Sequence, residues 1–132
     1  MCRKGIPGAR ACVGNILDED FELADILDEV PDVCLHLAWR NGFNHNHGSH
    51  MLDLSGHYRF LSQAIEFGIP QIACMGSMHE VGYWEGAIDE TTPCNPMSLY
   101  GIAKDALRRA LMRRGEQANV AIQWPRFLYL WG

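Results

Sequence analysis

Short apolar runs alternate along the chain with longer amphipathic stretches. The runs have the length of buried strands, and the stretches between them repeat their apolar residues at helical spacing. This alternation is typical of a parallel sheet whose strands are joined by helical crossovers, so the sequence predicts an α/β fold. The expected strands span residues 9–13, 32–38, 71–75 and 120–124.

Three segments are expected to be helical, namely residues 18–30, 48–67 and 98–114. The second has the clearest pattern, because its apolar residues follow one another at steps of three and four and Gly68 can close the helix. These residues are Met51, Leu54, Tyr58, Leu61 and Ile65. Residues 76–96 are rich in Gly, Pro and polar side chains, which predicts a long loop of the kind that lines a site.

The composition indicates one globular domain over residues 1–132. A hydrophobic content of 48% with 20% charged residues is ordinary globular chemistry. The net charge of −5 argues against a nucleic acid or an anionic membrane as partner, and no apolar run is long enough to span a bilayer. The five cysteines include no C-x-x-C pair, which argues against a disulfide framework. We therefore expect a soluble, cytoplasmic protein.

The sharpest local feature is the segment Tyr100-Gly-Ile-Ala-Lys104. Residues four apart at the start of a helix project from the same face. An ammonium group close to a phenol favours the phenolate, so Lys104 could lower the pKa of Tyr100 and let it exchange a proton with a hydroxyl group. Taken alone, the spacing also fits a core-facing tyrosine beside a solvated lysine, and that reading is the commoner one.

Ser77 changes this balance. It follows Gly76 at the end of an expected buried strand, which is the edge where α/β sheets bind ligands. A serine there could donate a hydrogen bond to the same substrate oxygen as Tyr100.

The order of strand, Gly-Ser turn, long loop and Tyr-x-x-x-Lys helix resembles the extended short-chain dehydrogenase/reductase superfamily. The branch that it looks like is that of the NAD(P)-dependent nucleotide-sugar epimerases, dehydratases and reductases. Four further segments resemble this family and spread over almost the whole chain: Gly14-Asn15-Ile16, Asp32–Trp39, Asp53-Leu-Ser-Gly56 and Pro125–Gly132.

The resemblance implies NAD or NADP as cofactor and a nucleotide sugar as substrate. The residues that it assigns to the cofactor are Asn15, Ile16, Leu37, Ala38, Trp39, Asp53, Tyr100, Lys104 and Phe127. Three of them depart from the family pattern. Asn15 stands where Asp is usual, Asp53 stands where Asn is usual, and Trp39 replaces a small residue.

The resemblance also implies a reaction, with Ser77, Tyr100 and Lys104 as catalytic residues. Tyr100 would take the proton of a sugar hydroxyl while hydride leaves for the nicotinamide, Lys104 would lower the tyrosine pKa and hold the ribose, and Ser77 would steady the oxygen. This chemistry suits an epimerase or a reductase. Family dehydratases follow their catalytic Thr with Asp-Glu, whereas Ser77 is followed by Met78-His79, so dehydration is not expected.

The Gly-rich phosphate loop of the family is absent from the sequence. Matched to the family, the chain lacks the first βαβ unit and the C-terminal substrate domain. We therefore expect a partial Rossmann-type doubly wound parallel sheet, with either a gap where the missing strands would lie or a strand pairing that the family does not have. A catalytically inactive truncated protein that acts through dimerisation is the alternative, and in either case helices 48–67 and 98–114 are expected to form a homodimer, as in the superfamily.

A histidine cluster is the last candidate site. Imidazoles spaced like His45, His47 and His50 can share a divalent ion. No carboxylate or Cys completes the set nearby, so solvated histidines are the better interpretation and no metal is expected. His36, inside an expected strand, is interpreted as a core histidine.

Overall fold

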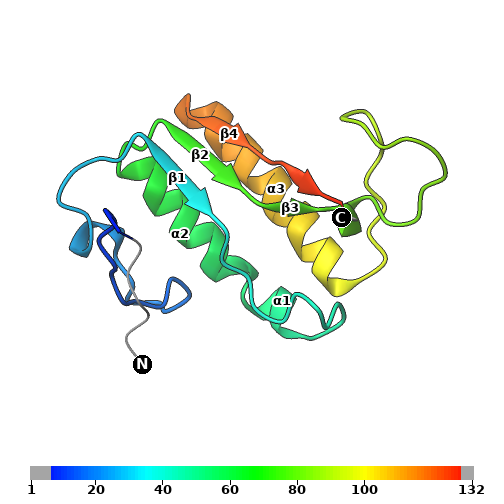
Figure 1. Ribbon diagram of the computed structural model, residues 1–132, viewed down its shortest axis with the longest axis horizontal. Coiled ribbons are helices and arrows are strands. Elements are labelled where there is room, and N and C mark those ends of the chain that lie inside the picture. Colours follow the sequence, from blue (N-terminus) through cyan, green and yellow to red (C-terminus); the bar gives the residue numbers. More distant parts are fainter. Residues whose placement is uncertain (1–6, 129–132) are drawn as a thin grey trace.

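A three-stranded parallel sheet forms the centre of the protein (Figure 1). The computed structural model describes residues 7–128. The strands are β1 (Val33–His36), β2 (Gln71–Cys74) and β4 (Ala121–Gln123), in the order β1-β2-β4. Both pairings are parallel, with Val33 opposite Gln71 and Gln71 opposite Ala121. The predicted α/β class and three of the four predicted strands are therefore confirmed.

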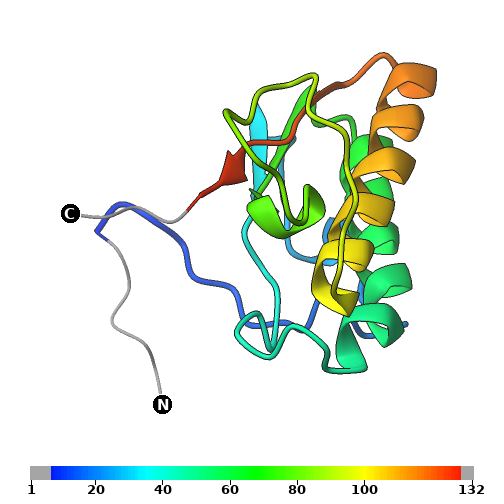
Figure 2. The same cartoon turned by 90° about the vertical axis from the view of Figure 1, so that its right-hand side faces the viewer.

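Two main helices lie side by side on one face of this sheet (Figure 2). These are α2 (Leu54–Glu66) and α3 (Leu99–Ala118), and the short helix α1 (Ser49–Leu52) precedes α2. The predicted helix 48–67 is thus confirmed with a break at Asp53, and Gly68 ends it at a φ of 95°. The predicted helix 98–114 continues to Ala118, where Asn119 closes it with a φ of 56°.

The core lies between this pair of helices and the sheet. The strand residues that face the helices are the more buried ones, for example His36, Ile72 and Cys74. On the other face of the sheet Val33 and Leu35 are 47% and 62% exposed. Within residues 7–128, the sheet therefore has a helical layer on one face alone.

The N-terminal segment corrects two predictions. Residues 9–13 form no strand and are exposed, because no neighbouring strand of the described chain lies beside them. The predicted helix 18–30 is reduced to the 3₁₀ turn η1 (Leu23–Asp25). Backbone groups in and just before this segment bond instead to side chains of α2. The Gln63 amide pairs with Phe21 O and Leu23 N, and Arg59 donates to Leu17 O.

A second, two-stranded sheet continues from the first. It pairs β3 (Gly76–Ser77) with β5 (Arg126–Phe127) in parallel and sets Ser77 opposite Phe127. The 3₁₀ helix η2 (Met78–Glu80) follows β3 directly and opens the predicted loop 76–96. No helix within residues 7–128 combines the length and the apolar character that a membrane span needs.

Candidate active site

Ser77, Tyr100 and Lys104 meet near the carboxyl ends of β1 and β2. Tyr100 lies in the first turn of α3, whose start is fixed by two hydrogen bonds. The Ser98 hydroxyl accepts from Gly101 N at 3.2 Å, and Tyr100 N donates to His45 O at 2.9 Å. The Ser77 side chain lies close enough to Tyr100 to lower the pKa of its phenol. The structure thus brings together the three residues predicted to be catalytic.

Gly101 allows this close approach. A Cβ atom at this position would lie 2.2 Å from the carbonyl oxygen of His79, so no larger residue fits between α3 and η2. The glycine therefore lets the helix that carries Tyr100 pack against the turn that carries Ser77.

Lys104 is buried at 4% exposure, one helical turn beyond Tyr100. Its ammonium donates to Met75 O at 2.7 Å and lies 4.2 Å from the centre of the Trp39 ring and 6.0 Å from that of Tyr100. Burial lowers the pKa of Lys104 to about 8, although the negative charge of Glu80 opposes the shift.

The prediction that Tyr100 has a lowered pKa is wrong for this structure. Burial of the phenol raises its pKa, the nearby Ser77 side chain lowers it in part, and the charge of Glu80 raises it further. The ammonium of Lys104 is directed to Met75 O and Trp39, and desolvation of the phenol prevails. Tyr100 is therefore a protonated phenol at neutral pH.

Trp39 and three histidines surround Tyr100. Trp39 stacks on His57 with ring centres 4.4 Å apart and donates to His50 Nδ1 at 3.0 Å. His50 is buried and its Nε2 pairs with Asn44 O, so the prediction of a solvated side chain is wrong for this residue. Ring centres of His45, His50 and His79 lie 5.8, 5.2 and 5.6 Å from that of Tyr100.

This histidine arrangement was missed by sequence reasoning, which grouped His45, His47 and His50 by spacing. His47 is exposed, and the imidazole that joins the other two at Tyr100 is His79, from a distant segment. Within residues 7–128 no group of three or more His, Cys, Asp or Glu is arranged to hold a metal ion.

His36 and His57 form a buried pair beneath Trp39. Their ring nitrogens Nε2 and Nδ1 lie 3.2 Å apart, and both side chains are less than 4% exposed. Burial lowers the pKa of His36 to about 3 and that of His57 to about 4, so both rings are neutral at physiological pH. The interpretation of His36 as a core histidine agrees with this packing.

A pocket of about 400 Å³ opens at the carboxyl end of β1. Four of the residues assigned to the cofactor line it: Asn15, Ile16, Ala38 and Trp39. An amide, aliphatic side chains and an indole face together suit an adenine nucleotide, since they offer hydrogen bonds and stacking. The chemistry of this part of the chain therefore fits NAD.

The remaining cofactor assignments are more scattered. Leu37 is 55% exposed beside the pocket, and Phe127 lies on β5 next to Ser77. The carboxylate of Asp53 is bound by the guanidinium of Arg40, with Nη2 to Oδ1 at 2.7 Å. Its negative charge is thus compensated within the protein.

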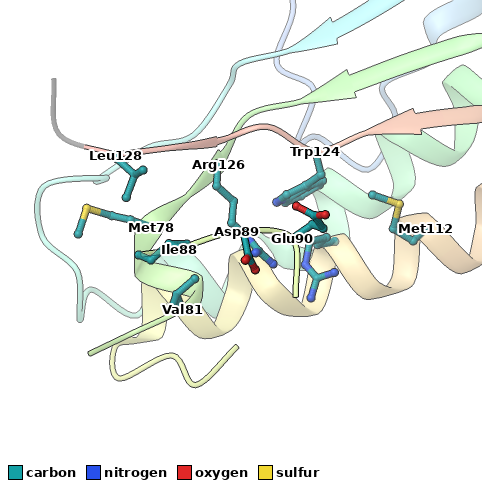
Figure 3. A pocket seen from close by; sticks show the side chains of 10 residues that line it. Met78, Val81, Ile88, Asp89, Glu90, Met112, Trp124, Arg126 and Leu128 are labelled. Atoms are coloured by element: carbon teal, nitrogen blue, oxygen red, sulfur yellow. The ribbon is translucent and has the colours of Figure 1, made fainter. Parts of the chain in front are cut away.

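A second pocket, of about 380 Å³, lies between α3 and the segment that joins β4 to β5 (Figure 3). Met78, the residue after Ser77, lines it together with Trp124, Arg126 and Met112. Pro125–Phe127 was expected to end a strand near the nicotinamide, and residues 129–132 of that segment lie outside the described residues.

Similarity to known proteins extends over nearly the whole chain. Residues 2–130 match the family described as "NAD dependent epimerase/dehydratase family". The chain belongs to this family. The resemblance drawn from the Tyr-x-x-x-Lys helix and its companion segments is thereby confirmed.

One curated relative within the epimerase/dehydratase family is the dTDP-6-deoxy-L-talose 4-dehydrogenase (NAD(+)) of Aggregatibacter actinomycetemcomitans. It is 41% identical over 128 residues, which cover 96% of this chain and 47% of the relative. The chain thus spans about half the length of the relative.

Solved structures confirm the fold. UDP-glucuronic acid 4-epimerase from Bacillus cereus, in complex with UDP-glucuronic acid and NAD, matches with a TM-score of 0.72 and 21% identity, covering 90% of this chain and 38% of that protein. The Bordetella bronchiseptica enzyme WbmH in complex with NAD⁺ matches with a TM-score of 0.68 and 19% identity, covering 93% and 42%. The expected partial Rossmann-type architecture is confirmed.

Proposed function

We propose that the intact protein containing this chain is an NAD-dependent enzyme that reduces a keto group of a nucleotide sugar, with Tyr100 as the proton donor. One observation carries the proposal: Ser77, at the end of β3, lies beside Tyr100 and Lys104, which stand one turn apart on α3. A protonated phenol is the state that reduction requires, because the carbonyl oxygen gains a proton as its carbon gains hydride.

Each of the three residues has a distinct task. Tyr100 donates its proton to the carbonyl oxygen, and the Ser77 hydroxyl beside Tyr100 orients that oxygen. Lys104 places its positive charge 6.0 Å from the centre of the Tyr100 ring, where it would hold the ribose of the cofactor. In the reverse direction the phenolate takes the proton of a sugar hydroxyl.

The cofactor assignments complete the proposal. Asn15, Ile16, Ala38 and Trp39 would hold the adenosine portion in the pocket at the end of β1, and Leu37, Asp53 and Phe127 would lie along the rest of the cofactor. NAD supplies the hydride donor or acceptor when bound. Lys104 would contact the ribose with its ammonium group.

The substrate class follows from the relatives. The A. actinomycetemcomitans relative is named for a dTDP-6-deoxy sugar and oxidation at carbon 4, and the B. cereus epimerase binds UDP-glucuronic acid. We therefore propose a nucleoside-diphosphate 4-keto sugar. The identity of 41% to the dehydrogenase favours net reduction over epimerisation.

The test uses the intact protein, NADH and a dTDP-4-keto-6-deoxy sugar, with NADH oxidation followed by absorbance. We expect stoichiometric oxidation with wild type and loss of at least about a thousandfold in kcat with Tyr100→Phe, since the proton donor is removed. Tyr58→Phe, at an outward position of α2, is the matched control and should keep wild-type activity.

Other results would redirect the proposal. Wild-type turnover by Tyr100→Phe would overturn the role of the phenol. Interconversion of two UDP-hexoses without net NADH oxidation would identify an epimerase. Failure of the intact protein to bind NADH or NADPH would favour the catalytically inactive alternative.

We also propose a homodimer in the cytoplasm, formed through helices 48–67 and 98–114. The outer surface of this helical layer exposes Ile102, which supports a contact there. Cys12, Cys34, Cys74 and Cys94 are free thiols, in keeping with a reducing compartment. Light scattering of the intact protein should give twice the subunit mass, and Ile102→Glu should shift it toward the monomer.

A further inference from the structure

The carboxylate of Glu80 is fully buried beside Ser77, with an exposed fraction of 0%. Its Oε1 accepts a hydrogen bond from Ser77 N at 2.7 Å, while the Ser77 hydroxyl accepts one from His79 N at 3.2 Å. The two bonds form a capping box that fixes Ser77 in an extended conformation at the start of η2. Glu80 thereby fixes the backbone of Ser77, the residue beside Tyr100.

The other side of the carboxylate is held by the segment after β4. Trp124 Nε1 donates to both carboxylate oxygens at 3.0 and 3.1 Å, and Arg126 Nε donates to Oε2 at 3.3 Å. Arg108 Nε, from α3, lies 3.5 Å from Oε2. Figure 3 shows the Trp124 and Arg126 side chains extending from their strand segment toward α3. Burying a carboxylate is costly, and these donors compensate the charge.

Glu80 therefore links four elements at one point: β3, η2, α3 and the β4–β5 segment. A buried carboxylate that links several elements in this way can have a purely structural role. Glu80 differs from such a residue in two respects. It accepts a hydrogen bond from Ser77 N, and its negative charge raises the pKa of both Tyr100 and Lys104.

We propose that Glu80 is a positioning residue of the reaction, whose buried carboxylate sets Ser77 against Tyr100 and keeps a negative charge behind the catalytic pair. This inference rests on the proposed function. The charged and titratable groups that face Glu80 and Tyr100 are Arg108, Arg126, Lys104, His45, His50 and His79.

The first test is Glu80→Gln in the intact protein, assayed with NADH and the keto sugar over a range of pH. The amide still accepts from Ser77 N but carries no charge. We expect kcat to fall about 10- to 100-fold with KM for the sugar within about twofold, because Ser77 is slightly displaced relative to Tyr100. The alkaline limb of kcat should move to lower pH, since loss of the carboxylate lowers the pKa of Tyr100 and of Lys104.

A second variant separates positioning from folding. Glu80→Gln leaves Arg126 without its carboxylate, so Glu80→Gln combined with Arg126→Met restores the balance of charge. We expect the double variant to recover thermal stability but to keep the low kcat and the shifted pH profile. Glu80→Asp, which retains the charge but is shorter by one methylene, should lower kcat and leave the alkaline limb in place. The exposed Glu90, mutated to Gln, is the matched control for loss of a carboxylate and should behave as wild type.

The outcomes separate this inference from the proposed function. An unchanged pH profile in Glu80→Gln, or recovery of kcat together with stability in the double variant, overturns the positioning role. Tyr100→Phe is assayed in parallel. If Tyr100→Phe retains turnover, the proposed function fails. If it is inactive while the Glu80 variants match wild type, the inference about Glu80 alone fails.

Discussion

The ammonium of Lys104 lies 4.2 Å from the centre of the Trp39 ring, in a site where the family pattern has a small residue rather than an indole. The cation is therefore solvated by a π face and by one carbonyl group, Met75 O, rather than by water. Such an environment supports a charge less well than water does, and this explains why burial lowers the pKa of Lys104 to about 8.

Lys104→Met should reveal this cost through the pH dependence of stability. The lysine pKa is about 8 in the folded protein and 10.5 for a freely solvated side chain, so between these values the unfolded chain binds more protons and wild-type stability rises with pH. We expect the stability advantage of Lys104→Met at pH 7 to shrink by about 3 kcal/mol as the pH approaches 10.5. Urea unfolding at a series of pH values measures it. A difference independent of pH would contradict a buried, charged Lys104.

The His36–His57 pair should make the protein sensitive to acid. Both rings are neutral when folded, with pKa values of about 3 and about 4, whereas the ordinary pKa of a solvated histidine is 6.5. Below pH 6.5 the unfolded chain takes up protons that the folded protein does not, so stability is lost as the pH falls toward 4. In His57→Phe we expect the loss between pH 6.5 and pH 4 to be about 3 kcal/mol smaller than in wild type.

The exposed His47 provides the matched control for this measurement. Its replacement by Gln should leave the acid limb of the stability curve unchanged. An equal effect of the two substitutions would show that general charge, and not the buried pair, governs acid unfolding.

Gly101→Ala should separate the helix of Tyr100 from the turn of Ser77. The added methyl group would lie 2.2 Å from the His79 carbonyl oxygen, so α3 or η2 must move. We expect a loss of about 2 kcal/mol in the free energy of unfolding. We also expect kcat to fall by a larger fraction of its wild-type value than the free energy of unfolding does. Calorimetry and steady-state kinetics give the two values.

Gly42→Ala is the control for the added methyl group, because a Cβ atom there has open space around it. It should leave both stability and kcat close to wild type. If Gly101→Ala behaves in the same way, the close packing of α3 on η2 is not what places Tyr100.

Local sequence patterns predicted two kinds of element correctly: strands that are fully buried and helices whose own residues stabilise them. The strand 71–75 and the helix 98–114 were recognised from apolar runs and from periodicity, and both are present. Residues 18–30 carry the same helical spacing but remain irregular, because Gln63 and Arg59 of α2 satisfy their backbone groups. These partners are 40 or more residues distant, so no local pattern reports them.

The candidate site shows the same division. The spacing of Tyr100 and Lys104 placed both on one helical face, as found. The direction of the Tyr100 pKa depends on burial and on Glu80, and the direction of the ammonium depends on Met75, which is 29 residues away in the chain. The burial of Glu80 among donors from three elements arises in the folded protein alone.

The uncovered face of the sheet has a practical consequence for work with the isolated chain. Val33 and Leu35 present an apolar surface on β1, and within residues 7–128 β1 is an edge strand whose outer backbone groups can pair with another strand. Together they favour edge-to-edge self-association at the concentrations used for crystallisation or NMR. The 132 residues are therefore best stored dilute and handled with a solubility partner.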